Sequence, residues 1–383
     1  MSQSYNFISL FSGIGGLDAG LHSAGFQPLF CVEKDRHALA TLKIWLSQQK
    51  IECNIDEDVT NIYPERLRTK LGLRKGELDL IAGGPPCQSF SSIGKKQSLV
   101  DERGLLLFQM IRYVKAFMPR AVLIEQVKGL LSAASLEGVK GGVFKKLIGD
   151  LEELGYQVNH SILRAADYGV PQLRDRLFII ATLNKKFTFP LPTHIANVDS
   201  NKRDRDRNIF HLLLKPYKTV GDVIKDLPQP VLKGEAENFP NHVDATPARD
   251  RARINGVPEG ECLAKQLHLP AEQRQRLNPK KDTTKFRRLA WDKPSLTLRG
   301  GEVFYHPCEN RYLTPRECLR LHGFCDKRVL IGPIRGRCGT VKNLDQHRLV
   351  ANAVPPPLAK VIGENIIEQI LAQEKPRLVV KTL

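Results

Sequence analysis

The stretch Phe11-Ser12-Gly13-Ile14-Gly15-Gly16-Leu17-Asp18 decides the fold of this chain. It follows an apolar run, Phe7 to Phe11, and opens the segment Gly16 to Ala24, whose apolar residues recur at helical spacing. A strand, a glycine turn and a helix in this order place the turn at the carboxyl end of a parallel sheet, where backbone can approach a ligand. Asp18 replaces the third glycine of G-x-G-x-x-G, which disfavours a pyrophosphate cofactor. A purely structural turn is the alternative.

The same alternation continues through the first half of the chain and predicts a βα-repeating domain with a parallel sheet. The expected strands are Phe7 to Phe11, Pro28 to Glu33, Leu78 to Ala82, Ala121 to Glu125 and Leu177 to Ala181. The expected helices are Gly16 to Ala24, Asp35 to Gln48, Gly104 to Phe117 and Gly142 to Leu154, and a helical period returns over Val350 to Ile370.

After Thr182 the sequence changes to prolines and charged runs with few clear strands or helices, which predicts a separate, loop-rich module. The whole chain of 383 residues has 58 Lys and Arg against 41 Asp and Glu, a net charge of +17. Residues 185–299 alone have 23 Lys and Arg against 14 Asp and Glu, about half of the excess. This bias favours contact with a polyanion such as nucleic acid, and a solvated surface is the alternative.

Other classes of protein are excluded or disfavoured by composition. The start of the chain lacks a signal sequence, and no apolar run approaches the roughly 20 residues that span a bilayer, so we expect a soluble, intracellular protein without membrane contact. The eight cysteines are scattered, without C-x-x-C or a Cys/His knuckle. We therefore expect reduced thiols and no metal site.

Two carboxylates follow predicted strands at the edge where the glycine turn lies. Glu33 ends the second strand, where it can accept hydrogen bonds from both hydroxyls of a ribose. Asp58 lies at the next strand end, where it can meet an adenine amino group. Each alone could be a solvated carboxylate or a helix cap. Together they describe an adenosine without phosphates, and S-adenosylmethionine is such a ligand.

The loop Gly83-Gly84-Pro85-Pro86-Cys87-Gln88-Ser89-Phe90-Ser91 emerges on the same edge and brings a thiol beside a methyl donor. Prolines lack N–H groups, so this backbone offers carbonyls that can accept from an exocyclic amino group of a base. Carbon 5 of cytosine is a poor nucleophile, but addition of the Cys87 thiolate to carbon 6 converts the ring to an enamine that can attack a sulfonium methyl. A small buried cysteine is the alternative.

Three further residues are candidates for handling the base. Glu125 ends an apolar run on the same edge and could hold a proton at ring N3 if it is sufficiently buried. In Gln172-Leu173-Arg174-Asp175-Arg176, the two arginines share one face of an extended segment. Arg176 could hold the O2 of the base, and Arg174 could position the loop or a phosphate. Surface ion pairing is the alternative.

With these residues in view, the chain resembles the DNA (cytosine-5) methyltransferases, of the type found in prokaryotic modification enzymes. The resemblance runs in order across nearly the whole chain. The matching stretches are Phe11 to Gly16, Gly84 to Gln88, the Gln172-x-Arg174-x-Arg176 motif, Arg311 to Glu317 with Arg320 to Phe324, and Asn352 to Pro355.

The resemblance implies an α/β fold: a Rossmann-like S-adenosylmethionine-dependent domain formed by residues 1–186 and 340–383, and a smaller, loop-rich target-recognition domain and hinge at 187–339. It implies that a cytosine is flipped out of duplex DNA into the site. The expected catalytic residues are Cys87, Glu125, Arg174 and Arg176. The expected cofactor residues are Phe11, Gly13, Ile14, Gly15, Gly16, Leu17, Glu33, Asp58, Val59, Pro86 and, by resemblance alone, Asn352 and Val354. The expected DNA contacts are Gln88, Ser91, Thr297 and Arg299.

The chain departs from the family pattern at two positions. Gln126 replaces the asparagine that usually follows the motif glutamate, and Ala351 replaces a glycine before Asn352. Gln126 has one more methylene than asparagine, which changes how its side chain can orient the loop from Gly83 to Ser91, here called the Pro-Cys loop. Ala351 adds only a methyl group. We expect activity with an altered rate.

The sequence favours site-specific methylation of double-stranded DNA by a cytoplasmic monomer, either paired with a cognate restriction endonuclease or solitary. One alternative is a tRNA cytosine-5 methyltransferase, because a branch of the same family uses similar motifs on RNA. A second is a DNA-binding regulator without catalysis, which the presence of Cys87, Glu125 and Arg176 disfavours.

Overall fold

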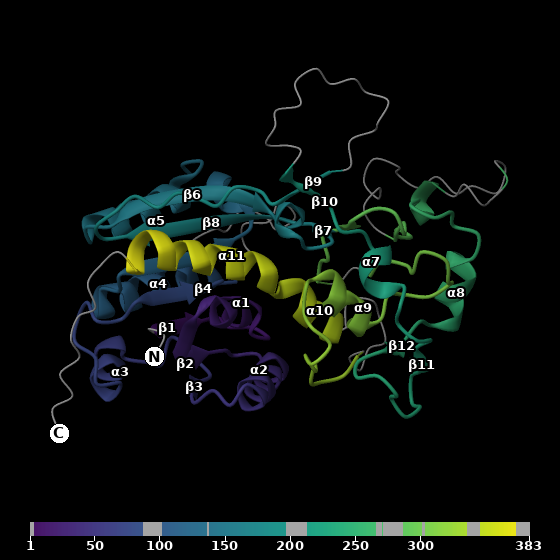
Figure 1. Cartoon of the computed structure of the whole chain (residues 1–383), viewed down its shortest axis with the longest axis horizontal. Coiled ribbons are helices and arrows are strands. Elements are labelled where there is room, and N and C mark those ends of the chain that lie inside the picture. Colours follow the sequence, from purple (N-terminus) through teal and green to yellow (C-terminus); the bar gives the residue numbers. More distant parts are fainter. Residues whose placement is uncertain are drawn as a thin grey trace, which may run out of the picture. The chain divides into compact units, whose positions relative to one another are not determined.

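The computed structural model of the chain describes residues 4–86, 102–135, 138–196, 213–265, 270, 286–300, 303–334 and 345–372. The chain divides into two compact units (Figure 1). The first comprises Met1–Leu163, Asp175–Leu191 and Leu358–Leu383, and the second comprises Arg164–Arg174 and Pro192–Pro357. The predicted division of the chain at residues 186 and 340 stays a prediction. In the structure, residues 345–357 group with the second unit.

Within the described residues, a seven-stranded sheet in the order β3-β2-β1-β4-β5-β8-β6 organises the first unit. The strands are β1 (Tyr5–Leu10), β2 (Phe26–Val32), β3 (Asn54–Asp56), β4 (Leu80–Gly83), β5 (Ala121–Gln126), β6 (Gln157–Arg164) and β8 (Asp175–Thr182). The five strands from β3 to β5 are parallel, and β1 lies between β2 and β4. The strand order therefore reverses beside β1, and ligands of open α/β sheets bind at such a point.

The prediction of a parallel sheet is confirmed except at one edge. Strand β8 runs antiparallel to β5, with Glu125 opposite Phe178. It follows β6 through a short excursion, η2 (Ala165–Tyr168) and β7 (Gln172–Leu173), and not through a covering helix. A strand that returns without a crossover helix pairs antiparallel, so the connection accounts for the difference.

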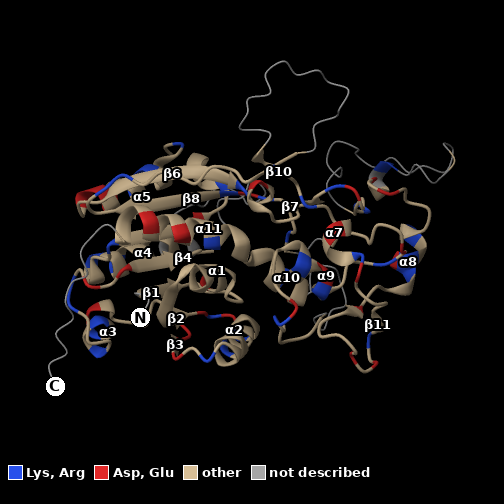
Figure 2. Ribbon diagram, viewed as in Figure 1, with Lys and Arg blue, Asp and Glu red and all other residues tan. Residues whose placement is uncertain are grey.

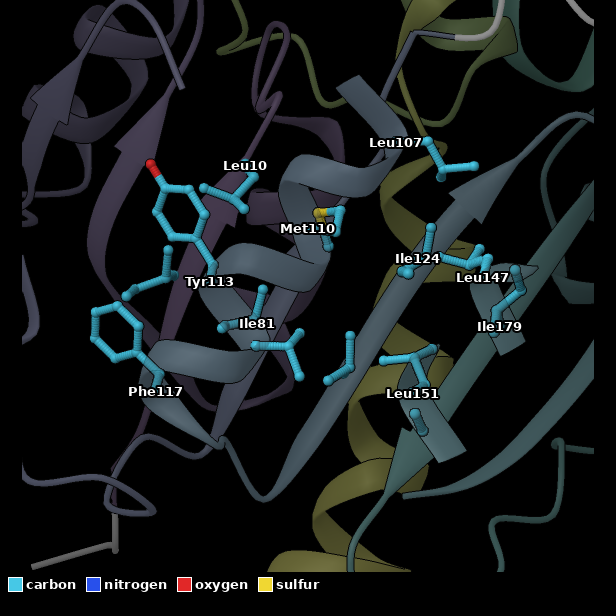
Figure 3. Packing of buried hydrophobic residues seen from close by; sticks show 14 of the residues in the cluster. Leu10, Ile81, Leu107, Met110, Tyr113, Phe117, Ile124, Leu147, Leu151 and Ile179 are labelled. Carbon is cyan, nitrogen blue, oxygen red and sulfur yellow. The ribbon is translucent and has the colours of Figure 1, made fainter. Parts of the chain in front are cut away.

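Helices cover both faces of this sheet. They are α1 (Gly16–Ala24), α2 (Arg36–Gln48), α3 (Pro64–Lys70), α4 (Glu102–Phe117), η1 (Lys128–Ser132), α5 (Gly142–Glu153), α11 (Pro356–Ile366) and the π-helical turn Ile367–Leu371. Alternate strand residues such as Leu10, Ile81 and Ile124 pack against Met110 of α4 and Leu147 of α5 in one buried cluster (Figure 3). Alternation of this kind lets one strand serve two helical layers.

Close packing defines the opposite layer. A Cβ atom on Gly363 of α11 would lie 2.9 Å from Cβ of Ala24 and 3.1 Å from Leu21, both of α1, and 3.6 Å from Phe26 of β2. Helix α11 therefore reaches the N-terminal helix and strand at a distance only glycine permits. No helix in the described part of the chain is long and apolar enough to cross a membrane.

The second unit has little regular structure, as predicted. Its described pairs of strands have two residues each: β9 (His194–Ile195) with β10 (Lys215–Pro216), β11 (Val231–Leu232) with β12 (Val243–Asp244), and β7 with β13 (Ser295–Leu296). Its helices are α7 (Gly221–Ile224), α8 (Ala248–Ile254), η3 (Leu263–Lys265), α9 (Pro315–Leu321) and α10 (Asp345–Asn352). Thr314 and Glu317 form a capping box that begins α9.

Candidate active site

The glycine turn follows β1 in a left-handed backbone conformation. Phe11, Gly13 and Gly15 have φ values of 60°, 59° and 75°. A Cβ on Gly13 would meet no atom within 4 Å, so the backbone conformation, and not lack of space, favours glycine there. The turn ends at Gly15, which is the N-cap of α1. Ile14 therefore lies in the turn, whereas Gly16 and Leu17 begin the helix at the carboxyl edge of the sheet.

Glu33, the residue directly after β2, fixes the glycine turn. Its Oε2 accepts a hydrogen bond from the Gly13 N–H at 2.7 Å, and its Oε1 accepts from the Asp35 N–H at 2.7 Å. Burial raises the pKa of this carboxyl group, although the two N–H groups act in the opposite direction. Each oxygen keeps a second lone pair, so the carboxylate can still accept from hydroxyl groups of a ligand.

Asp58 lies just beyond β3 and is held in its charged form. Lys34 Nζ lies 2.8 Å from Asp58 Oδ2, and the Thr60 hydroxyl and N–H donate to Oδ1 at 2.7 and 3.0 Å. These donors, the lysine first, lower the pKa of Asp58 to about 2. Val59 beside it is buried in the main apolar cluster, and its carbonyl accepts from Tyr113. Asp58 is thus a charged hydrogen-bond acceptor whose neighbour, Val59, is anchored in the apolar core.

The start of the Pro-Cys loop packs so closely against the sheet that Gly83 leaves no room for a side chain. A Cβ on Gly83 would lie 2.7 Å from the carbonyl oxygen of Leu10 and 2.8 Å from Sδ of Met110. A Cβ on Gly84 would lie 3.4 Å from Oε2 of Glu125. Pro85 is buried and Pro86 is exposed. Cys87, Gln88 and Ser91 lie outside the described residues.

Gln126 holds this loop through a direct hydrogen bond. Its Nε2 donates to the carbonyl oxygen of Pro85 at 2.6 Å, and its side chain is buried. The longer side chain at this position therefore keeps a contact with the loop. It also occupies one of the carbonyls that the sequence suggested for a base.

Glu125 and Arg176 form an ion pair next to the loop. Strands β5 and β8 are neighbours, and Arg176 Nε lies 3.1 Å from Glu125 Oε1. The two side chains are only 12% and 15% exposed. Arg176 Nη1 also donates to the carbonyl of Asp175 at 2.8 Å. A carboxylate and a guanidinium side by side can contact adjacent polar atoms on one edge of a ring.

Arg174, two residues earlier, belongs to the second unit. Its buried guanidinium donates to the carbonyl oxygens of Leu298 at 3.2 Å, Ala351 at 2.9 Å and Ala353 at 3.1 Å. These are the contacts of a residue that fixes backbone segments. Its predicted catalytic role stays a prediction.

Sequence reasoning assigned no role to two residues of this network, Gln172 and His322. Gln172 Nε2 lies 3.1 Å from His322 Nδ1, Gln172 Oε1 accepts from the Leu298 N–H at 3.1 Å, and His322 Nε2 donates to the carbonyl of Ala353 at 2.8 Å. Both residues lie inside the motifs that resemble the family, and this position was the feature of the sequence that could have pointed to them. They hold the segment that contains the predicted cofactor residues Asn352 and Val354.

The predicted DNA contacts that the structure describes also lie in the second unit. The Thr297 hydroxyl donates to the carbonyl of Leu173 at 2.7 Å, beside the β7–β13 pair. Arg299, two residues later, is exposed. Lys and Arg positions occur along several segments of the ribbon of this unit, including helix α8, which contains Arg249, Arg251 and Arg253 (Figure 2). Roles in DNA contact stay predictions for Thr297 and Arg299.

One group with metal-ligand character occurs among the described residues, His306, Cys308 and Glu309 in the second unit. Its atoms already have protein partners. Glu309 Oε2 pairs with Arg311 Nε at 2.9 Å, and His306 Nδ1 accepts from the Glu309 N–H at 3.2 Å. The expectation of no metal stays a prediction.

Comparison with known proteins decides the family. Residues 5–368 match the family described as C-5 cytosine-specific DNA methylase. The chain belongs to this family. The methylase is 32% identical over 400 residues to the Type II methyltransferase M.PspPI of Psychrobacter sp., covering 98% of this chain and 82% of the relative. It is 31% identical to the Type II methyltransferase M1.HphI of Haemophilus parahaemolyticus, covering 96% of this chain and 87% of the relative.

Solved structures agree on the fold of the methylase. A crystal structure of a putative DNA modification methyltransferase encoded within an E. coli prophage superposes with a TM-score of 0.66 at 23% identity, covering 97% of this chain and 100% of that chain. The predicted family, the Rossmann-like methyltransferase fold and DNA (cytosine-5) methyltransferase activity of the Type II restriction-modification kind are confirmed. Members of this family take the methyl group from S-adenosylmethionine and act on DNA.

Proposed function

We propose that the methylase flips a cytosine out of duplex DNA and methylates carbon 5 through a covalent adduct between Cys87 and carbon 6. The observation that carries this proposal is the Glu125–Arg176 ion pair beside the Pro-Cys loop, 3.1 Å between Nε and Oε1. The loop leaves β4 beside Glu125, since a Cβ on Gly84 would lie 3.4 Å from Glu125 Oε2, and Gln126 donates to the carbonyl of Pro85. The next residue along the chain after Pro86 is the proposed nucleophile.

The polar edge of cytosine matches this pair of side chains. O2 is an acceptor for the Arg176 guanidinium, and the adjacent N3 and amino group can exchange hydrogen bonds with the Glu125 carboxyl group. A proton shared between Glu125 and N3 withdraws electrons from the ring as the Cys87 thiolate adds to carbon 6. Carbon 5 then becomes nucleophilic. After methyl transfer, loss of the carbon 5 proton and elimination of Cys87 restore the aromatic ring.

The residues around β1 and β2 fit S-adenosylmethionine. The left-handed glycine turn brings backbone close to a ligand at the reversal of strand order, and Glu33 and Asp58 offer carboxylate acceptors at adjacent strand ends. Glu33 would take the ribose hydroxyls and Asp58 the adenine amino group. When bound, this cofactor supplies an electrophilic methyl group. The residues Phe11, Gly13, Ile14, Gly15, Gly16, Leu17, Val59 and Pro86 would line it, with Asn352 and Val354 by family resemblance.

Transfer of labelled methyl groups tests this function. Purified protein is incubated with labelled S-adenosylmethionine and either duplex DNA or tRNA. We expect label in DNA at carbon 5 of cytosine, confirmed by bisulfite sequencing, and none in tRNA. Label in tRNA alone would support the RNA enzyme instead, and label in neither would support a regulator. A cognate endonuclease, a monomeric state and a cytoplasmic location remain part of the proposal.

A further inference from the structure

Two cysteine thiols contact each other beside β2 and β3, the two strands that precede the proposed cofactor residues Glu33 and Asp58. Cys31 lies in β2, and Cys53 directly precedes β3. Their sulfur atoms are 3.5 Å apart. The two strands are parallel neighbours, with Cys31 opposite Ile55. The six cysteines that the structure describes are free thiols, so this contact joins two reduced side chains.

The surroundings give the two thiols different properties. Cys31 is buried with Leu42, Trp45 and Leu46, whereas Cys53 is partly exposed. The Cys31 thiol donates to Oδ1 of the buried Asp18 at 3.5 Å, and the Cys53 thiol lies 3.3 Å from the carbonyl of Asn54. The Cys53 contact, burial and Asp18 all raise the pKa of Cys31. Because Cys53 is the more exposed of the two, oxidants reach it first. Cys31 lies behind it as a protonated thiol whose proton points to the Asp18 carboxyl group.

We propose that Cys31 and Cys53 are a disulfide-forming modification site that responds to peroxide. Hydrogen peroxide converts the Cys53 thiol to a sulfenic acid and releases one water. The Cys31 sulfur then attacks the Cys53 sulfur, the S–O bond breaks, and the proton of Cys31 leaves with the hydroxyl group as a second water, assisted by Asp18. One peroxide is reduced and two thiols are oxidised, so atoms and electrons balance.

The bond has a consequence for the strands that it joins. A disulfide is about 2 Å long, so the sulfur atoms must approach by about 1.5 Å. Glu33 follows Cys31 by two residues, and its N–H donates to the carbonyl of Asp56 in β3 at 3.2 Å. Asp58 follows Cys53 by five residues. Oxidation therefore shifts the strand ends that present both carboxylates, and it lowers cofactor affinity; this second step rests on the proposed function.

Peptide mapping of the full chain tests the disulfide directly. After peroxide treatment and alkylation of free thiols, trypsin releases residues 1–34 and 51–66, each with a single cysteine. We expect these peptides joined and lighter by two hydrogens, and separated by dithiothreitol. Cys53→Ser or Cys53→Ala should abolish the link, and Cys325→Ser, at an exposed cysteine of the second unit, should retain it. Alkylated or separately oxidised Cys31 and Cys53 without a link would overturn the proposal.

Calorimetric binding of S-adenosylmethionine tests the consequence, in a Cys87→Ser background so that oxidation of the proposed nucleophile does not contribute. We expect affinity to fall on the order of tenfold on oxidation and to recover with dithiothreitol. Cys53→Ser should bind equally before and after peroxide. An unchanged affinity in linked protein would overturn the effect on the cofactor but not the disulfide. Reduced protein that does not bind the cofactor would instead contradict the proposed function.

Discussion

Gln126 connects strand β5 to the loop that leads to Cys87. Its amide reaches the carbonyl of Pro85 at 2.6 Å in a buried environment. An asparagine at this position is one methylene shorter, so it would have to approach the loop by a different path. The extra length of this side chain is thus part of how this chain positions its loop.

Replacing Gln126 by alanine removes the only donor identified for the Pro85 carbonyl among the described contacts. Leaving a buried acceptor unsatisfied costs about 1–3 kcal/mol, which corresponds to roughly a ten- to hundredfold loss of kcat if the loop must hold this position during catalysis. The KM for S-adenosylmethionine should stay within about twofold. Steady-state kinetics measures both values. Gln48→Ala, at an exposed glutamine of α2, is the control, and a fully active Gln126→Ala would exclude a positioning role.

The sequence predicted which residues are candidates for the site, but not the partners that the structure gives them. Glu125 and Arg176 were predicted separately, and their ion pair depends on β8 running antiparallel beside β5. The buried position of Arg174 depends on carbonyls more than 120 residues away in sequence. Spacing along one segment does not specify such contacts, because they arise only when distant segments pack.

The predicted ends of helices agree with the structure where a capping residue or a glycine fixes the end locally. Helix α1 has the predicted bounds, and α2 begins one residue later than predicted because Asp35 is its N-cap, accepting from the N–H groups of His37 and Ala38. The edge strand β6 was not predicted, since its sequence mixes polar and apolar residues without a clear period. Short elements such as β3 and α3 carry too few residues for a periodic signal.

A substitution at Gly83 tests the packing of β4, the strand from which the Pro-Cys loop emerges. Gly83→Ala would place a methyl group 2.7 Å from a backbone oxygen of β1 and 2.8 Å from Met110, so β1, β4 or α4 must move. We expect destabilisation of about 1–3 kcal/mol and reduced activity. Gly149→Ala, in α5 with no atom near the added methyl group, should be neutral or stabilising. Denaturant unfolding compares them, and equal stabilities would contradict this packing.

Helix α10 carries a buried histidine from which we predict that the stability of the second unit decreases in acid. His347 is buried, its Nε2 donates to the carbonyl of Leu313 at 2.7 Å, and burial lowers its pKa to about 4. An unfolded histidine has a pKa of about 6.5, so between these values the unfolded chain binds a proton that the folded chain excludes. Stability is therefore complete above about pH 6.5 and falls as the pH decreases towards 4.

His347→Gln removes this titration while keeping a donor. Urea unfolding at several pH values should show a smaller loss of stability below pH 6.5 in the variant than in the wild type, by an amount on the order of 2–3 kcal/mol near pH 4. Part of the loss should remain, because burial also lowers the pKa values of His242 and His306. Identical pH profiles would show that His347 does not titrate as described.

At the scale of the whole molecule, the net charge of +17 predicts how DNA is held. Phosphate contacts release counterions, so affinity for duplex DNA without a specific site should fall steeply with salt, about a thousandfold between about 50 and 200 mM for about six contacts. Replacing Arg249 and Arg253, both largely exposed on α8, by glutamine should reduce this slope. Fluorescence anisotropy titrations measure it. Affinity independent of salt would contradict an electrostatic mode of binding.

Covalent trapping on DNA tests the central claim most directly. Duplex DNA with 5-fluorocytosine at the methylated position blocks loss of the substituent at carbon 5, so an enzyme that works through an adduct at carbon 6 stays attached. With S-adenosylmethionine present, we expect a denaturation-resistant protein–DNA complex for the wild type and none for Cys87→Ala, whereas Cys325→Ala should form the complex. Methylation of ordinary cytosine by the wild type without any trapped complex would contradict the proposed mechanism.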